Sequence, residues 1–358
     1  MNIEHVDKNF IINNEKVNNV KYYNIKDKPI SIHGVVYNNN LARYERMDDS
    51  VASSISGNLS FLNGCSSGGR IRFKTNSQVI SLKVFLGKVW GQAFHSKKMA
   101  VSFSLYVNNH FYKLFSPDNK WNMLDESTYE SIINFEDKKI KNIDIYFPLY
   151  TFIKDVYVGI NEESLIKAPK TYKYSNPVVF YGSSTTQGCC ASRPGNSYPA
   201  FLSQSLGIDY LNLGFSGNGK AEKTMAEYIS NLPMSVFVFD YDYNAETVGE
   251  LKANHLSFYK IIRKSNPNLP IILMPKPNAE PNPKEHIERI NVIKETFNYA
   301  KSNGDNHIYF IDNRFLYKGN YGYAHTVDGC HPNDLGFYLI ARQMKPILRK
   351  ILKENYHD

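Results

Sequence analysis

The chain has 358 residues, of which 42% are hydrophobic and 21% charged, values that fit a globular protein and exclude a disordered or fibrous one. At about 100–200 residues per domain, this length favours two domains over one. The net charge is +8, and most of the excess lies in residues 1–175, with 23 Lys and Arg against 17 Asp and Glu, whereas residues 176–358 have 19 against 17.

The sequence lacks the features of a membrane-spanning or exported protein. No apolar run reaches the roughly 18 residues that a transmembrane helix needs. The first ten residues contain no apolar stretch of the signal-peptide type. Four cysteines are too few for a disulfide scaffold, and the adjacent Cys189 and Cys190 are poorly spaced for a simple bridge. We therefore expect a reduced, cytoplasmic protein.

The first half of the chain predicts an antiparallel β-sandwich of the jelly-roll type. Short β-rich runs separated by turn residues occur between residues 32 and 159, with no convincing long helix. In residues 101–107, VSFSLYV, apolar and polar side chains alternate as in a half-buried strand. Further runs are Arg70–Lys74, Val79–Phe85, Ser131–Phe135 and Ile143–Phe147. We assign residues 1–168 to this accessory domain.

The second half, residues 177–358, predicts an α/β domain with a parallel sheet. Apolar runs typical of strands covered on both faces are Val178–Tyr181, Tyr210–Leu213, Val236–Phe239, Ile271–Met274 and Ile308–Ile311. The apolar residues of Lys284–Ser302 recur every three or four positions, which predicts an amphipathic helix. Asn333 or Asp334 can cap a final helix that runs to about Leu352. A polar linker, residues 168–176, joins the two halves.

Polar clusters follow the predicted parallel strands. They are GSSTTQG at residues 182–188, GFSGNG at residues 214–219, DYDYN at residues 240–244 and, in a longer loop, DGCHP at residues 328–332. Ligands of open α/β sheets bind outside the carboxyl ends of the strands, where all four clusters converge. This convergence favours an enzyme.

The residue types in these clusters fit acyl transfer, which needs a nucleophile, a base, a group that orients the base, and oxyanion donors. A serine of the first cluster provides the nucleophile, His331 the base and Asp328 the orienting carboxylate. Gly217 offers an accessible backbone N–H, and Asn244 a side-chain amide. Each feature alone also fits a helix cap, a turn or an exposed loop, and only the combination indicates catalysis.

These blocks resemble those of the SGNH, or GDSL-type, hydrolase superfamily. GSSTTQG resembles the GSSITQG variant of the first block, which puts the nucleophile on Ser184. NLGFSGNG, residues 212–219, matches the second block with Gly217 at the oxyanion position, and DGCHP matches the fifth. The third block differs from the family pattern, because DYDYNA at residues 240–245 replaces the usual Gly-x-Asn-Asp. We assign Asn244 as the oxyanion asparagine of this block. The branch with this first block also has an N-terminal β-sandwich.

The resemblance implies a three-layer α/β/α domain of flavodoxin-like type and hydrolysis of an ester through an acyl-serine intermediate. His331 would take the proton from Ser184, and Asp328 would stabilise the imidazolium. The oxyanion would be bound by the N–H groups of Ser184 and Gly217 and by the side chain of Asn244. The resemblance implies no cofactor and no metal.

The substrate implied by the resemblance is a small acyl ester, acetyl in the first place, on a small molecule or an oligosaccharide. Arg193, close after the first block, is a candidate contact to substrate or to the N-terminal domain. Tyr323, in a loop with Tyr317 and Tyr321, can stack on a sugar ring or pack the loop. A lipase or acyltransferase of the same fold, or an inactive carbohydrate-binding protein, is the alternative. The oligomeric state stays open.

Two further classes compete with the serine enzyme. A metal hydrolase would use His325, Asp328, Cys330 and His331, but no Cys-x-x-Cys or His-Glu-x-x-His spacing supports it. A nucleic-acid-binding protein would use the basic excess, but the Lys and Arg residues form no dense run or recognised motif. We therefore expect no metal, nucleic acid or membrane as a partner.

Overall fold

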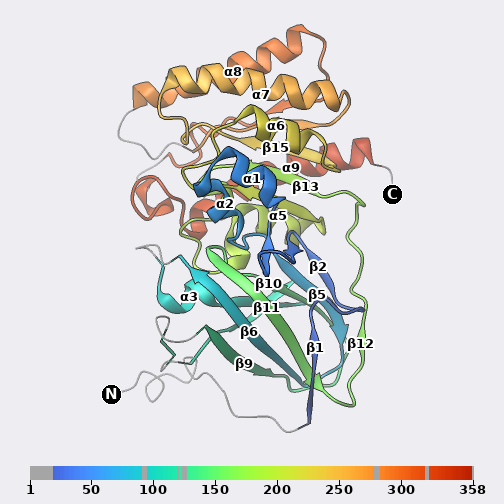
Figure 1. Ribbon diagram of the computed structural model, residues 1–358. Coiled ribbons are helices and arrows are strands. Elements are labelled where there is room, and N and C mark those ends of the chain that lie inside the picture. The colour runs from blue at the N-terminus through green and yellow to red at the C-terminus, as the bar shows by residue number, and fades with distance from the viewer. Residues whose placement is uncertain are drawn as a thin grey trace.

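Antiparallel sheets form the N-terminal half of the computed structural model, and a parallel sheet flanked by helices forms the C-terminal half (Figure 1). The structure describes residues 19–90, 95–118, 121–122, 127–277, 283–318 and 322–356. Within these ranges every helix is too short or too polar to cross a membrane.

The N-terminal half is the predicted β-sandwich. One sheet has the order β1-β11-β6-β9, with bounds Val20–Asn24, Thr151–Asn161, Val79–Val89 and Thr128–Asn134. The other has the order β12-β5-β10-β7-β8, with bounds Ile166–Lys167, Arg70–Thr75, Lys141–Tyr146, Phe103–Val107 and His110–Phe115, and β2 (Ser31–His33) pairs with β5. The strands β3 (Val36–Asn38) and β4 (Arg43–Glu45) form a separate antiparallel hairpin.

Alternating side chains build the core of the sandwich. In β6 the alternate residues Ile80, Leu82, Val84 and Leu86 are all buried in one cluster, because successive strand residues point to opposite faces. The strand expected over residues 101–107 begins at Phe103, since the short helix α3 (Lys97–Val101) precedes it.

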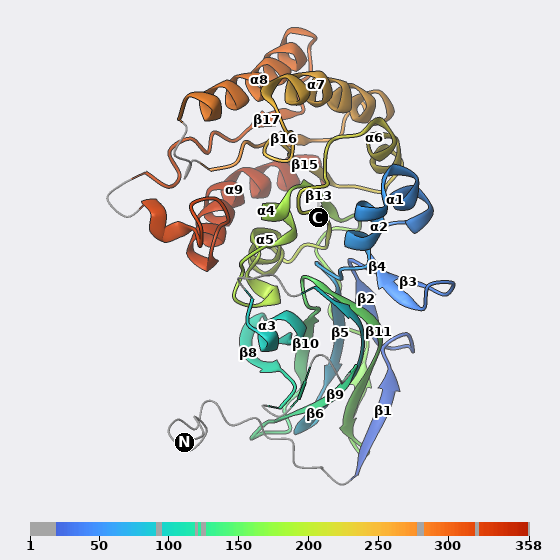
Figure 2. The ribbon, with the colours of Figure 1, turned by 60° about the vertical axis from the view of Figure 1, so that its left-hand side comes forward.

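The N-terminal half also contains two short helices that its sequence did not reveal. These are α1 (Asp49–Ile55) and α2 (Gly57–Asn63), whose N-caps Asp48 and Ser56 accept backbone hydrogen bonds from Ser50 and Leu59. Seven residues are too few for a clear helical period. Both helices share a hydrophobic cluster with the parallel-sheet half, and Figure 2 shows them beside α6 (Lys223–Ser230).

The parallel sheet has the strand order β14-β13-β15-β16-β17, which is the order of the flavodoxin-like fold that the resemblance implied. In chain order β13 to β17 span Val178–Gly182, Tyr210–Gly214, Val236–Asp240, Ile271–Leu273 and Ile308–Phe310. The helices are α4 (Ser184–Gln187), α5 (Tyr198–Leu206), α6, α7 (Val248–Ser265), α8 (Pro283–Ser302) and α9 (Asp334–Asn355), with 3-10 turns η3 (Pro194–Asn196) and η4 (Gly322–His325). Asn333 caps α9, so the predicted final helix is confirmed.

Helices cover both faces of this sheet, as a buried parallel sheet requires. On β13, Val179 and Tyr181 point into a cluster with α6, α7 and α8. Val178 and Phe180 point to the opposite face, into a cluster with α5 and α9. The three-layer α/β/α arrangement predicted from the sequence is therefore confirmed.

Two buried arginines join the two halves of the chain. The guanidinium of Arg46 donates to the carbonyl oxygens of Asn212 and Gly214 on β14. The guanidinium of Arg70 forms an ion pair with Asp209 and donates to Tyr210 O at 3.0 Å. Because both guanidinium groups are fully buried, their carbonyl and carboxylate partners offset a large cost of desolvation.

The Asp209→Asn variant tests the second of these links. The change leaves the buried guanidinium of Arg70 without its countercharge, so we expect the free energy of unfolding to fall by about 3–5 kcal/mol. Glu354→Gln is the matched control, because it breaks a pair with Lys350 in which both side chains are mostly exposed, and such pairs contribute about 0.5 kcal/mol or less. Urea unfolding of both variants measures the difference. Equal stabilities of the two would contradict the role of Asp209.

Candidate active site

The loops after three neighbouring strands emerge side by side. Gly182 at the end of β13 pairs in register with Gly214 at the end of β14 and with Asp240 at the end of β15. The Phe215 N–H donates to Gly182 O at 2.9 Å, which extends this alignment into the second loop. The first three sequence clusters therefore meet at one edge of the sheet.

Ser184 is the first residue of α4, directly after this edge. The Ser183 hydroxyl caps the helix by accepting the Thr185 N–H at 3.2 Å, and Gly188 ends it with φ +100°. Gly182 has no room for a side chain, because a Cβ atom there would lie 2.2 Å from Asp240 O. The Ser184 side chain is partly exposed, and neither its hydroxyl nor its backbone N–H hydrogen-bonds to any residue that the structure describes.

Gly217 and Asn244 belong to the two adjacent loops. Gly217 adopts φ +67° in a tight turn, and its N–H makes no hydrogen bond within the described part of the chain. The Asn244 side-chain amide donates to Phe215 O at 2.9 Å and to Gly219 O at 3.2 Å. Asn244 therefore holds the loop that carries Gly217.

Asp328 and His331 form a hydrogen-bonded pair. The distance from His331 Nδ1 to Asp328 Oδ2 is 2.7 Å, and the other carboxylate oxygen accepts the N–H groups of His331 at 2.7 Å and Cys330 at 2.9 Å. Burial raises the pKa of Asp328, but these hydrogen bonds outweigh it and lower the pKa to about 2. The carboxylate therefore stays charged, so Nδ1 carries the proton and Nε2 is left as a base.

The segment after α4 connects Ser184 to this pair. The Cys189 N–H donates to Ser184 O at 2.9 Å. The Sγ atoms of Cys189 and Cys190 and a ring nitrogen of His331 lie within 4.8 Å of one another. The structure forms no hydrogen bond between the Ser184 hydroxyl and His331, and such catalytic bonds often tighten only when substrate binds.

The two proposed substrate contacts lie in different surroundings. The guanidinium of Arg193 lies 3.7 Å from the centre of the Phe111 ring on β8 and also interacts with Tyr106, so it contacts the N-terminal half. This is one of the two roles expected for it, and substrate binding stays a prediction. Tyr323 in η4 is 71% exposed, whereas Tyr317 is buried and stacks on His325, and Tyr321 lies outside the described residues.

Of the four metal ligands proposed for the rival hydrolase, Asp328 and His331 pair with each other, but among the described residues no three of the four lie within coordinating range. His325 Nδ1 contacts Gly322 O at 2.8 Å, and Lys276 Nζ donates to Cys330 Sγ at 2.8 Å. Among the described residues, the group of three possible ligands that lies within coordinating range is instead Cys189, Cys190 and His331.

Several residues that support the site were not identified from the sequence. The Ser216 N–H donates to Gln187 Oε1 at 3.0 Å, and the Ser216 hydroxyl lies 2.7 Å from Tyr150 OH. Gln187 lies within the first polar cluster, so its position could have marked it as a site residue. Tyr150 lies in the N-terminal half, far from any motif, and no sequence pattern indicated its role.

Asp240 lies beneath the first loop as a buried acid. Its Oδ2 accepts the hydroxyl of Thr186 at 2.7 Å and that of Tyr198 at 3.2 Å. Burial, followed by the charge of Asp242, raises the pKa of Asp240 to about 8. At neutral pH the acid is therefore mostly protonated and links α4 to β15 without a buried charge.

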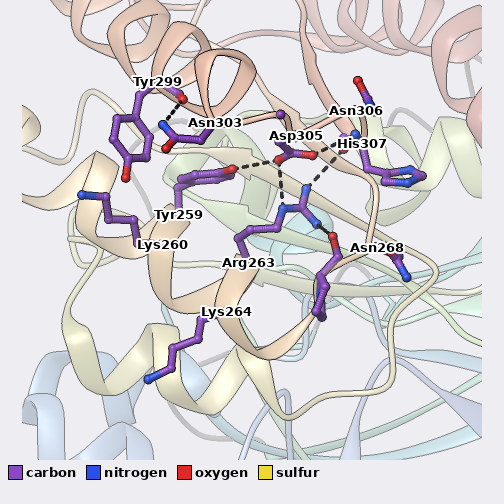
Figure 3. A pocket seen from close by; sticks show the side chains of 12 residues that line it. Tyr259, Lys260, Arg263, Lys264, Asn268, Tyr299, Asn303, Asp305, Asn306 and His307 are labelled. Atoms are coloured by element: carbon purple, nitrogen blue, oxygen red, sulfur yellow. Dashed lines mark hydrogen bonds and ion pairs between the residues drawn. The ribbon is translucent and has the colours of Figure 1, made fainter.

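Two large cavities lie away from this edge. One, of about 520 Å³, lies between the ends of α7 and α8 near the amino end of β17, and Figure 3 shows Tyr259 and Arg263 both pointing to Asp305 in it. The other, of about 620 Å³, lies between the β-sandwich and the end of α5. Both lie near the amino ends of parallel strands and contain none of the proposed catalytic residues.

Comparison with known proteins gives matches for both halves. Residues 175–349 match the GDSL-like lipase/acylhydrolase family, and residues 20–166 match the N-terminus of SGNH-hydrolase-type esterases. A Bacteroides ovatus protein described as a GDSL-like lipase is 27% identical, with 94% of this chain and 98% of that chain covered and a TM-score of 0.82. No protein of curated function matches the sequence.

Two further solved structures share the fold. The salicylyl-acyltransferase SsfX3 from a tetracycline biosynthetic pathway is 15% identical, with 94% and 98% of the two chains covered and a TM-score of 0.76. The acetyl xylan esterase Est2A from Butyrivibrio proteoclasticus is 14% identical, with 93% and 98% covered and a TM-score of 0.61.

The Asp240→Asn variant tests the buried acid. Because the pKa is about 8 in the folded chain against an ordinary 3.8, the folded wild type keeps a proton that the unfolded chain loses. Its free energy of unfolding should therefore fall as pH rises from about 4 to about 8, by up to about 1.4 kcal/mol per pH unit from this group. Asn cannot titrate, so the wild type should lose stability relative to the variant across this window. Urea unfolding at several pH values measures the difference, and a constant difference would contradict the raised pKa.

Proposed function

Since the chain belongs to the SGNH, or GDSL-type, hydrolases, which are carboxylic ester hydrolases, we propose that it is a serine esterase that removes small acyl groups, acetyl in the first place, from a carbohydrate. We assign the reaction to Ser184, His331 and Asp328. The family supports the reaction class, and the geometry at the sheet edge supports the residues.

One combined observation carries this proposal. The imidazole of His331 is oriented by a hydrogen bond, and two nearby backbone N–H groups, of Ser184 and Gly217, make no hydrogen bond to any described residue. Asp328 holds His331 through Nδ1 at 2.7 Å, so Nε2 can act as the base. The backbone N–H groups of Ser184 and Gly217 follow the ends of the neighbouring strands β13 and β14, and their lack of a hydrogen-bond partner among the described residues supports them as the oxyanion donors of the proposed reaction.

The proposed reaction has two steps. The Ser184 oxygen attacks the ester carbonyl while His331 takes its proton, and the alcohol then leaves with that proton, which gives an acyl-serine. Water attacks the acyl-serine with His331 again as the base, and the acid is released. Asp328 stabilises the imidazolium in both steps.

The oxyanion would accept hydrogen bonds from the N–H groups of Ser184 and Gly217. Asn244 can become the third donor if one of its amide hydrogens turns away from Gly219 O, the longer of its two bonds. In the structure its amide holds the loop of Gly217, so Asn244 supports the oxyanion hole in either position.

Two observations support a carbohydrate substrate: the structural similarity to a carbohydrate esterase and the exposed aromatic side chain of Tyr323. The fold is shared with the acetyl xylan esterase Est2A. Tyr323 is 71% exposed in the turn η4, five residues before Asp328, where an aromatic ring can stack on a sugar. A second candidate function is acyl transfer to another alcohol, favoured by the same fold in a salicylyl-acyltransferase.

The Ser184→Ala variant tests the nucleophile with p-nitrophenyl acetate as substrate. Removing the hydroxyl removes the acyl-serine, so kcat should fall by at least about 10³-fold. Ser183→Ala is the matched control, because it removes only a cap hydrogen bond worth about 1 kcal/mol and leaves the nucleophile in place. The control should keep measurable turnover. Equal rates in wild type and Ser184→Ala would refute the serine mechanism.

A strong chelator separates the serine mechanism from metal hydrolysis. The proposed steps use no metal, so p-nitrophenyl acetate hydrolysis in excess EDTA should be unchanged or higher. Loss of turnover in the chelator, restored by added metal, would overturn the proposal in favour of a metal hydrolase.

A substrate series tests the acyl group and the alcohol. We expect faster turnover of acetyl than of octanoyl p-nitrophenyl esters, and release of acetate from acetylated oligosaccharides. Acid and alcohol products are measured with and without a second acceptor alcohol. Faster turnover of the long chain would contradict the small-acyl preference, and transfer to the acceptor in preference to water would favour the acyltransferase.

A further inference from the structure

Two adjacent thiols lie beside the imidazole proposed as the base. Cys189 and Cys190 follow Gly188, where α4 ends, and their Sγ atoms are 3.5 Å apart. Cys190 has φ +70°, a left-handed conformation that is uncommon for a residue with a side chain. The two Sγ atoms and a ring nitrogen of His331 lie within 4.8 Å of one another.

This donor set has the chemistry of a zinc site. Two thiolates and an imidazole are preferred Zn²⁺ ligands, with Zn–S near about 2.3 Å and Zn–N near about 2.0–2.1 Å. Ligand atoms of a tetrahedral site with these bond lengths lie about 3.5–3.8 Å apart. The two Sγ atoms here are already 3.5 Å apart, and all three donor atoms lie within 4.8 Å of one another. Two thiolates also neutralise the ion, which reduces the cost of burying its charge.

Neighbouring groups hold these ligands in place. Asp328 contacts His331 Nδ1 at 2.7 Å, the carboxylate–histidine arrangement that directs the other ring nitrogen to a metal. The Cys190 N–H donates to His95 Nε2 at 3.3 Å, and Cys189 is fixed to Ser184 O through its own N–H at 2.9 Å. The thiols are thus attached to the same loop that carries the proposed nucleophile.

We propose that Cys189, Cys190 and His331 bind a thiophilic divalent cation, Zn²⁺ in the first place, and that the bound ion inhibits the esterase by occupying the imidazole nitrogen that the mechanism uses as a base. Each thiol releases its proton to solvent when it binds the metal. The site itself stands on the geometry alone, whereas the inhibition rests on the proposed function.

Metal binding is measured on the fully reduced, metal-free chain. We expect one Zn²⁺ per chain by equilibrium dialysis, and the Co²⁺ form should show the near-ultraviolet sulfur-to-cobalt charge-transfer band of thiolate ligands. The variants Cys189→Ser, Cys190→Ser and His331→Gln should each weaken Zn²⁺ binding at least about tenfold, since even changes around a ligand commonly cost that much. Cys65→Ala, which removes a buried thiol elsewhere, should bind Zn²⁺ as the wild type does.

Several results would overturn the site. They are the absence of Zn²⁺ binding by the reduced wild type, undiminished binding in both cysteine variants, and a Co²⁺ form without the charge-transfer band. The band is read on the wild type, so it remains decisive even if a variant fails to fold.

Inhibition is measured separately with p-nitrophenyl acetate. Saturating Zn²⁺ should remove most of the turnover of the wild type and of Cys65→Ala, and excess EDTA should restore it. Stoichiometric Zn²⁺ binding without any loss of turnover would overturn the inhibitory role. Absence of turnover under all conditions would instead refute the proposed function and leave the binding result standing.

Discussion

The common level at which β13, β14 and β15 end is the constraint on which the candidate site depends. Gly182 pairs with both Gly214 and Asp240, so the loops after β14 and β15, which are distant in sequence, each begin one strand away from the loop of Ser184. No side chain fits at Gly182, where a Cβ atom would meet both Asp240 O and the Thr186 hydroxyl. The close approach of backbone to backbone is therefore what places the Ser184 turn against its neighbours.

The N-terminal half is part of the scaffold of this edge. Arg46 donates to the last carbonyl groups of β14, immediately before the loop of Gly217, and its guanidinium lies over the Phe215 ring at 4.4 Å. Tyr150 reaches the same loop through the hydroxyl of Ser216. Part of the positive charge in this half therefore lies inside the molecule, where Arg46 binds carbonyl groups.

The same orientation of His331 fits two chemistries. The charged Asp328 carboxylate accepts the proton of Nδ1 in a hydrogen bond, so the lone pair of the neutral imidazole is on the other ring nitrogen. That lone pair can accept a proton from a serine or bind a metal ion. Ser184 and the two thiols occupy one short segment, joined by the hydrogen bond from Cys189 N–H to Ser184 O. In the proposed inhibition, a proton and a thiophilic cation compete for this one nitrogen atom.

The sequence by itself determined the parts of this protein that depend on local pattern. Buried apolar runs gave the parallel strands and one amphipathic period gave α8, because a strand covered on both faces and a helix with one apolar face leave distinct periods. A capping residue, Asn333 or Asp334, gave the start of α9, and Asn333 is the cap in the structure. The pairing of Asp328 with His331 was predicted from their spacing of three residues together with the other blocks, and the structure shows the hydrogen bond between them. Tertiary structure alone decided the rest. The helices α1 and α2 are too short to show a period, and their packing on the C-terminal half joins residues more than 150 positions apart. The meeting of Cys189, Cys190 and His331, and the contact of Arg193 with Phe111, depend likewise on chain segments that only the folded backbone brings side by side.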